Sequence, residues 1–214
     1  MNKETNLTDM ILDEGVIKFN YELIPAPPIE LHEYQELENW RKKLFKLKLI
    51  GEYPIEKVGY GNISKRTDHS PNSFLITGSQ TGHHKDLKGD HYTLILNADL
   101  QKQNVTAKGP IKPSSESLTH FAIYKASLEI KYVFHAHSAA IWKYMVEHNN
   151  DFDQTSENIG YGTLEMAEQV QSLIGNKTYG TIVMKGHQDG IIAYAKTPEE
   201  CGSLLIDLVE RSQL

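Results

Sequence analysis

The stretch YVFHAHSAAIW (132–142) decides how this sequence is interpreted. Its apolar first half is typical of a buried β-strand, and the strand ends with two histidines, His135 and His137, on either side of Ala136. Residues two apart on a strand point to the same face, so both imidazoles reach one place and can share a metal ion. Taken alone, the pair is weak evidence for a metal site, because such histidines more often lie in the core or at the surface without binding a metal.

A third histidine, His187, follows another apolar run in IVMKGHQDGII (182–192) and stands beside a glycine. Catalytic zinc sites use three protein ligands and leave a fourth position open, so His187 is the candidate that completes the set. The remaining histidines lie in loops, in polar stretches, at a strand start or on a helix, and we interpret them as non-ligands: His32, His69, His83, His84, His91, His120 and His148.

The composition is that of one globular domain. The chain has 214 residues, 39% of them hydrophobic, and we expect a domain over 30–214 that follows an N-terminal extension over 1–29. The net charge of −6 argues against binding to nucleic acid or to anionic membranes. The single cysteine, Cys201, excludes an intrachain disulfide, and we interpret it as structural. With neither a secretion signal nor a run of about 18 apolar residues, a cytoplasmic protein is expected.

Periodicity and capping signals predict a central sheet covered by helices. Apolar residues at helical spacing predict helices over 30–50, 114–128, 138–148, 163–175 and 197–210, the last with Thr197 as N-cap and Pro198 in its first turn. Apolar or alternating runs predict strands over 16–23, 60–66, 73–77, 91–97 and 131–137, and a pair of strands within 179–195.

Three polar stretches precede the histidine strand: YGNISKR (60–66), ITGSQTGHH (76–84) and KPSSES (112–117). Each combines glycine with hydroxyl or amide side chains, or presents paired serines, and the last begins a predicted helix, whose first N–H groups attract anions. Each stretch alone fits an ordinary turn or cap. Together, ahead of the histidines, they indicate a phosphate-binding pocket.

In this order, GNIS, LIT…TG, KPSSE, HAHS and the later H…GII resemble the class II aldolase/adducin family. The resemblance runs from about residue 35 to 210. The family includes zinc-dependent fuculose- and rhamnulose-phosphate aldolases, ribulose-phosphate 4-epimerase and methylthioribulose-phosphate dehydratase. It implies an α/β fold, a three-layer α/β/α sandwich around a mostly antiparallel sheet, and a homotetramer with active sites between subunits.

The resemblance implies that His135, His137 and His187 bind Zn²⁺ or another divalent metal, and that Glu116 is the catalytic acid/base beside it. It also implies a pocket for the phosphate of the substrate. Because ITGSQTG is one residue longer than the aldolase pattern, one corner of this pocket has two alternatives: Thr81 with Gly82, or Thr77 with Gly78. The other residues implied for this pocket are Gly61, Asn62, Ser114 and Ser115.

The implied chemistry is that of a zinc lyase. Zinc bound to the carbonyl and hydroxyl oxygens of a sugar phosphate stabilises the enediolate that forms when a C–C or C–H bond breaks, and a carboxylate near the metal moves the proton. Glu116 stands where epimerases of the family have aspartate, which favours an aldolase or a dehydratase. A dehydratase of the methylthioribulose-phosphate type is the alternative enzyme, and a non-catalytic, adducin-like interaction domain is the alternative from another class.

Two departures separate the chain from the fuculose aldolases. Their third histidine lies in HHG, whereas this chain has GHQDG around His187. The chain also ends in ERSQL, without the tyrosine-bearing tail of some aldolases. Tyr161, in IGYGT before a predicted helix, is the candidate catalytic tyrosine, with a packing role as the alternative.

Overall fold

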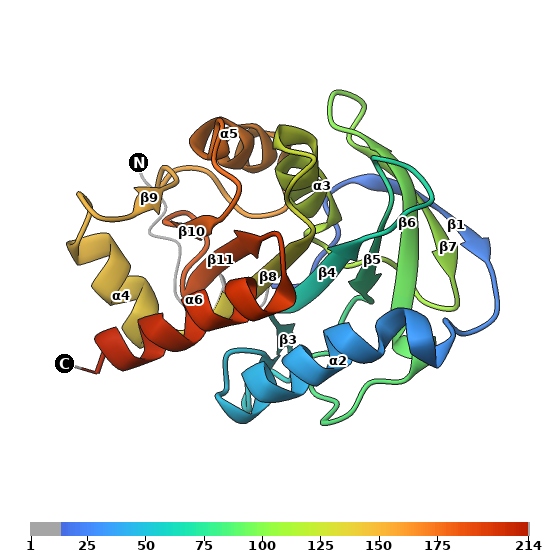
Figure 1. The fold of residues 1–214 in the computed structure, drawn as a ribbon, viewed down its shortest axis with the longest axis horizontal. Coiled ribbons are helices and arrows are strands. Elements are labelled where there is room, and N and C mark those ends of the chain that lie inside the picture. Colours follow the sequence, from blue (N-terminus) through green and yellow to red (C-terminus); the bar gives the residue numbers. More distant parts are fainter. Residues whose placement is uncertain (1–13, 214) are drawn as a thin grey trace.

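The computed structural model describes residues 14–213, and its centre is a single mixed sheet of nine strands (Figure 1). The strand order is β1-β7-β6-β5-β4-β8-β11-β10-β9; β1 with β7 and β9 with β10 are parallel pairs, and all other neighbours are antiparallel. The nine strands are β1 (Asn20–Pro25), β4 (Asn62–Arg66), β5 (Phe74–Thr77), β6 (Tyr92–Asp99), β7 (Asn104–Gly109), β8 (Tyr132–His137), β9 (Asp153–Gln154), β10 (Gly180–Val183) and β11 (Gly190–Ala195). The predicted α/β fold with a mostly antiparallel sheet is confirmed.

Helices cover both faces of the sheet. In Figure 1, α3 and α5 lie together on one side, and α2, α4 and α6 lie on the other. Each layer encloses its own apolar core, with Phe121 and Val170 in the first and Leu37 and Leu205 in the second. The helices are α2 (Leu31–Lys46), a 3-10 turn η1 (Gly89–His91), α3 (Ser117–Ala126), α4 (Ala139–Glu147), α5 (Leu164–Ile174) and α6 (Pro198–Arg211).

Local sequence signals account for most helix ends. Thr197 caps α6 through its side chain, which accepts a hydrogen bond from the N–H of Glu200, and Pro198 opens the helix as predicted. The start of α3 differs from the prediction. Helix begins at Ser117, and Glu116 occupies the cap position without a side-chain cap bond, while Ser114 contributes its carbonyl to a preceding turn. That turn places the Glu116 side chain at the sheet instead of in solvent.

Two strands at the far edge of the sheet depart from the prediction. The first strand begins at Asn20 instead of Val16, and it pairs with β7, which periodicity did not identify. Strand β7 carries only Val105 and Ala107 as buried apolar side chains, too weak a pattern to be recognised alone. Strand β1 therefore ties residues 20–25 into the sheet, although they lie in the predicted N-terminal extension. The proposed boundary between residues 29 and 30 stays a prediction.

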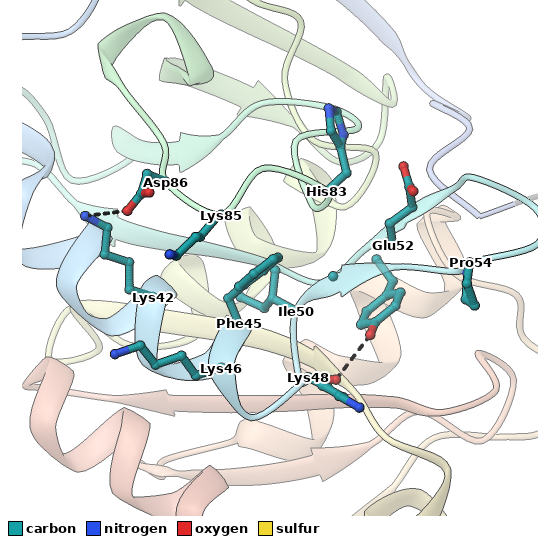
Figure 2. A pocket seen from close by; sticks show the side chains of 12 residues that line it. Lys42, Phe45, Lys46, Lys48, Ile50, Glu52, Pro54, His83, Lys85 and Asp86 are labelled. Carbon is teal, nitrogen blue, oxygen red and sulfur yellow. Dashed lines mark hydrogen bonds and ion pairs between the residues drawn. The ribbon is translucent and has the colours of Figure 1, made fainter.

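A surface pocket of about 780 Å³ opens beside the two-stranded sheet of β2 (Gly51–Glu52) and β3 (Gly59–Tyr60) (Figure 2). Phe45 and Ile50 form part of its apolar lining, and Tyr60 donates a hydrogen bond to the carbonyl of Lys48 at one end. Its charged lining residues are mostly lysines: Lys42, Lys46, Lys48 and Lys85, with Glu52 and Asp86. Its lining includes none of His135, His137 and His187.

Within residues 14–213, the helices are all too short or too polar to cross a membrane. The longest, α2, has 16 residues and carries lysine and glutamate along much of its length.

Candidate metal centre

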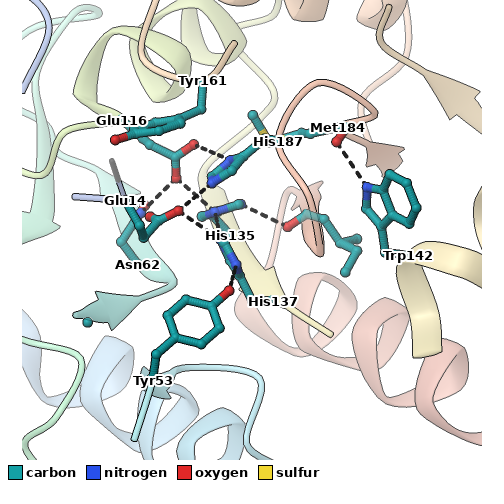
Figure 3. A network of polar contacts seen from close by, with 12 residues as sticks. Glu14, Tyr53, Asn62, Glu116, His135, His137, Trp142, Tyr161, Met184 and His187 are labelled. Carbon is teal, nitrogen blue, oxygen red and sulfur yellow. Dashed lines mark hydrogen bonds and ion pairs between the residues drawn. The ribbon is translucent and has the colours of Figure 1, made fainter. Parts of the chain in front are cut away.

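Strand β8 delivers His135 and His137 to one face of the sheet. Its side chains alternate: Val133 belongs to the core under α3 and α5, whereas Phe134 and Ala136 belong to the core on the other face. The two histidines share the face of Val133, so the period of two places both imidazoles toward the start of α3. They are 0% and 4% exposed, and their Nε2 atoms lie 2.9 Å apart (Figure 3).

His187 reaches the same point from the turn between β10 and β11. Its backbone N–H bonds to the carbonyl of Met184, whose carbonyl also accepts a bond from the indole of Trp142 at 3.0 Å. Gly190 is required after this turn because a Cβ there would lie 3.0 Å from Nδ1 of His187. One ring nitrogen from each of the three histidines falls within 4.8 Å of the others, as the sequence predicted.

The partners of the Nδ1 atoms identify which nitrogens are available to a metal. Nδ1 of His135 lies 3.1 Å from the carbonyl of Ile191, which can only accept, so Nδ1 is engaged with the backbone and Nε2 is the nitrogen that faces the candidate metal position. Nδ1 of His137 is hydrogen-bonded to the hydroxyl of Tyr53 at 2.9 Å. Burial and the neighbouring His187 and His135 hold the pKa of His137 well below its usual value, so this imidazole is neutral.

Glu116 places a carboxylate against the histidines. It is 1% exposed, and its Oε2 lies 2.9 Å from Nε2 of His135 and accepts a hydrogen bond from Nδ2 of Asn62 at 2.9 Å. Burial alone would raise its pKa, but the adjacent His135 and His187 outweigh burial and hold the pKa well below the usual value. Its Oε1 lies 3.5 Å from Nδ1 of His187 and has no hydrogen-bond partner among the described residues.

The donor set fits a divalent cation. Two Nε2 atoms only 2.9 Å apart, on two rings that are both buried, repel each other unless a proton or a metal ion lies between them. Burial lowers the pKa of His187, but the carboxylates of Glu14 and Glu116 outweigh burial and raise it to about 10. The close approach of the two Nε2 atoms calls for positive charge between them, and buried imidazoles with a carboxylate are ligands that zinc and similar metals accept.

The predicted phosphate-binding residues surround a small polar cavity of about 20 Å³ next to this centre. Thr77 does not line it; its hydroxyl accepts a bond from the N–H of Ile63, and Gly78 lines the cavity instead. The predicted residues that line it are Gly61, Asn62, Thr81, Gly82, Ser114 and Ser115.

Comparison with known proteins identifies the family. Residues 47–214 match the family described as the class II aldolase and adducin N-terminal domain. The chain belongs to this family. A comparison with curated proteins gives no significant match.

Solved structures of class II aldolase-family proteins share the fold. L-fuculose-1-phosphate aldolase from Thermus thermophilus is 20% identical, with 86% of this chain and 92% of that one covered and a TM-score of 0.63. A sugar-phosphate aldolase from Thermotoga maritima is 17% identical, with 85% and 92% covered and a TM-score of 0.63. L-fuculose 1-phosphate aldolase from Glaciozyma antarctica is 14% identical, with 88% and 76% covered and a TM-score of 0.61. The shared fold extends over most of each chain.

The structure places Tyr161 beside the metal centre. Its ring stacks on that of His187 with 4.5 Å between centroids, and its hydroxyl accepts a hydrogen bond from the N–H of Val16 at 3.2 Å. The tyrosine therefore both packs against a candidate ligand and reaches the polar side of the site. Its catalytic role stays a prediction.

Two residues at the centre had no signal in the sequence. Tyr53 comes from the loop between β2 and β3, and Glu14 comes from the chain before β1. Neither lies in a motif or in a periodic run. Tyr53 and Glu14 lie at this class II aldolase-family site because the irregular segments that carry them pack against it.

Proposed function

We propose that this protein is a metal-dependent lyase, with zinc as the expected metal, that cleaves a small sugar phosphate or a related hydroxy-carbonyl compound by a retro-aldol reaction. One observation supports this most directly: three buried histidines converge, with the Glu116 carboxylate 2.9 Å from Nε2 of His135. Membership of the class II aldolase and adducin family agrees with that set of groups.

When bound, the metal supplies a Lewis acid that stabilises negative charge on the oxygens of the substrate as a bond to carbon breaks. Glu116 is the group in this chain that can take or return the proton. Asn62 donates to Oε2 and so fixes the carboxylate, while Oε1 makes no hydrogen bond among the described residues and is the oxygen proposed to carry the proton. Tyr161, stacked on His187, is the proposed second proton carrier.

The residues around the small polar cavity form the proposed site for the phosphate of the substrate, which needs the cavity to widen because Glu14 and Gly15 now line it. The cavity is lined by Gly61, Ser114 and Ser115, whose N–H and hydroxyl groups suit an anion, and it lies where α3 begins. Asn62 lines this cavity and also contacts Glu116, so the phosphate end and the reacting end of one small molecule fit adjacent positions. Anchoring the unreactive end orients the bond that breaks.

The same groups also suit a dehydratase of the methylthioribulose-phosphate type, and the products separate the two reactions. A non-catalytic, adducin-like role is disfavoured because His135, His137, His187 and Glu116 are all present and meet. We further propose a cytoplasmic homotetramer, as expected for the family.

Mass spectrometry of the zinc-loaded protein, incubated with pentulose, hexulose and thiopentulose phosphates and their unphosphorylated analogues, tests the proposal. Release of a two- or three-carbon fragment supports the aldolase, whereas loss of water supports the dehydratase. Glu116→Gln is the matched variant, expected to turn over at least about 100-fold more slowly. Absence of turnover across the panel by the metal-loaded wild-type protein would contradict a sugar-phosphate lyase.

A further inference from the structure

The N-terminal segment, residues 14–18, lies across the metal centre. Val16 donates its N–H to the hydroxyl of Tyr161 at 3.2 Å, and the side-chain amide of Gln80 donates to the carbonyl of Glu14 at 3.4 Å. Just beyond the segment, Phe19 is buried in the core beneath α3 and α5. The segment is thus held at both sides of the site by side chains from distant parts of the chain.

Glu14 points its carboxylate into the place where the three histidines converge (Figure 3). Its Oε2 lies 2.6 Å from Nε2 of His187 and 3.8 Å from Nε2 of His137. The residue is only 7% exposed, which is unusual for a glutamate unless the charge has a partner. Since Nε2 of His137 also faces His135, the carboxylate lies beside the point where the ring nitrogens of the three histidines meet.

Two carboxylates are buried together at this site. Glu14 and Glu116 are both buried, and every ion-pair partner of these two carboxylates among the described residues is a histidine of the set. A divalent metal bound among these buried carboxylates and imidazoles would offset the negative charge that burial otherwise makes costly. A glutamate oxygen is also an ordinary zinc ligand.

We propose that Glu14 is a fourth protein ligand of the metal, supplied by the N-terminal segment. In this arrangement the carboxylate fills the position that three-histidine catalytic sites leave open. Glu14 and Gly15 also line the small cavity, whose volume of about 20 Å³ suits one water molecule and excludes a phosphate group. The segment therefore covers the metal position and the small cavity together. Glu14 must move away before substrate oxygens can bind the metal. That exchange rests on the proposed function, whereas metal ligation by Glu14 does not.

Gly15 is what lets the chain turn at this point. Its φ is +76°, and a Cβ would lie 1.9 Å from Nε2 of Gln80. An alanine at this position keeps the Glu14 carboxylate but strains the turn that aims it. Gly15→Ala and Glu14→Gln are therefore two independent ways to remove the same contact, one through the backbone and one through the charge.

The experiment compares Zn²⁺ affinity, by competition with a chromogenic chelator, in wild type, Glu14→Gln and Glu22→Gln. Glu22 is an exposed glutamate on β1 and serves as the matched control. Loss of a ligand should weaken Zn²⁺ binding at least about tenfold in Glu14→Gln and leave Glu22→Gln at the wild-type value. With Co²⁺ in place of Zn²⁺, the visible absorption bands should shift only in Glu14→Gln.

Acetohydroxamate, a small chelator with two oxygen donors, tests whether Glu14 holds the open position. Titrated into the Co²⁺ protein, it should bind at least about tenfold more tightly to Glu14→Gln than to wild type, because no carboxylate competes. Equal Zn²⁺ affinity, Co²⁺ spectrum and acetohydroxamate binding in the two proteins would overturn the proposal. If Glu14→Gln fails to fold, Gly15→Ala decides by the same readouts. None of them requires turnover, so failure of the substrate panel and failure of this ligand assignment are separate results.

Discussion

The hydroxyl of Tyr53 lies 2.9 Å from Nδ1 of His137, on the side of the ring opposite the nitrogen that faces His135. Tyr53 belongs to a loop 84 residues away in sequence, yet it fixes the orientation of a candidate metal ligand. Partners of this kind hold the ring so that its other nitrogen points at the metal, and they are usually as important as the ligands themselves.

Tyr53→Phe removes this hydrogen bond and little else. We expect Zn²⁺ affinity to fall by about 10- to 100-fold, as is usual when such a partner is lost, and chelator competition measures it. Tyr60→Phe is the matched control, because Tyr60 also packs near His137 but gives its hydroxyl to the carbonyl of Lys48. Wild-type Zn²⁺ affinity in Tyr53→Phe, or a loss no larger than that in Tyr60→Phe, would show that the hydroxyl of Tyr53 does not hold His137 for the metal.

His187→Ala tests the third ligand. With His187 absent, His135 and His137 remain as a two-nitrogen site, and the bound metal per chain should fall from about one to well below one after dialysis, as measured by elemental analysis. His69→Ala, at an exposed position, should keep the full metal content. Unchanged metal in His187→Ala would remove this residue from the ligand set.

Periodicity alone was sufficient for one part of the site. Since strand side chains alternate, the sequence HAH on an apolar run required both imidazoles to share a face, and β8 has that arrangement. Bringing His187 and Glu116 to the same place needed long-range information, which came from the order of motifs shared with the family. The central sheet and most helix ends followed from the same local signals, as Thr197 and Pro198 illustrate.

The remaining parts had no local signal. Glu14 and Tyr53 reach the centre from segments without regular structure, so their positions depend on tertiary contacts such as the bond from Gln80 to Glu14. Strand β7 was missed because Val105 and Ala107 bury little apolar area, and its partner on one side is the N-terminal strand. When two segments that are distant in sequence pair at the edge of a sheet, neither sequence contains a pattern that predicts the pairing.

Gly61 is expected to be intolerant of a side chain. Its φ is +74°, and a Cβ would lie 2.9 Å from Ile50 and 3.1 Å from the carbonyl of His135. Gly61→Ala should therefore lower the free energy of unfolding by about 1–2 kcal/mol from the backbone alone, measured by urea denaturation. Gly160→Ala is the matched control because nothing lies within 4 Å of its Cβ position, and it should differ from wild type by less than about 0.5 kcal/mol. A loss in Gly160→Ala as large as that in Gly61→Ala would contradict this explanation.

His120 makes the protein sensitive to acid. It is fully buried on α3, where its Nδ1 bonds to the hydroxyl of Ser64 at 2.7 Å, and burial lowers its pKa from 6.5 to about 3. In the unfolded chain His120 binds a proton below about pH 6.5, whereas in the folded protein it binds one only below about pH 3. The free energy of unfolding therefore falls as the pH drops through this window. One such proton changes the free energy of unfolding by at most about 1.4 kcal/mol per pH unit. Urea denaturation of wild type and His120→Gln between pH 7 and 5 measures this dependence. The variant should show a shallower slope, and equal slopes would mean that His120 binds its proton over the same pH range in the folded and unfolded protein.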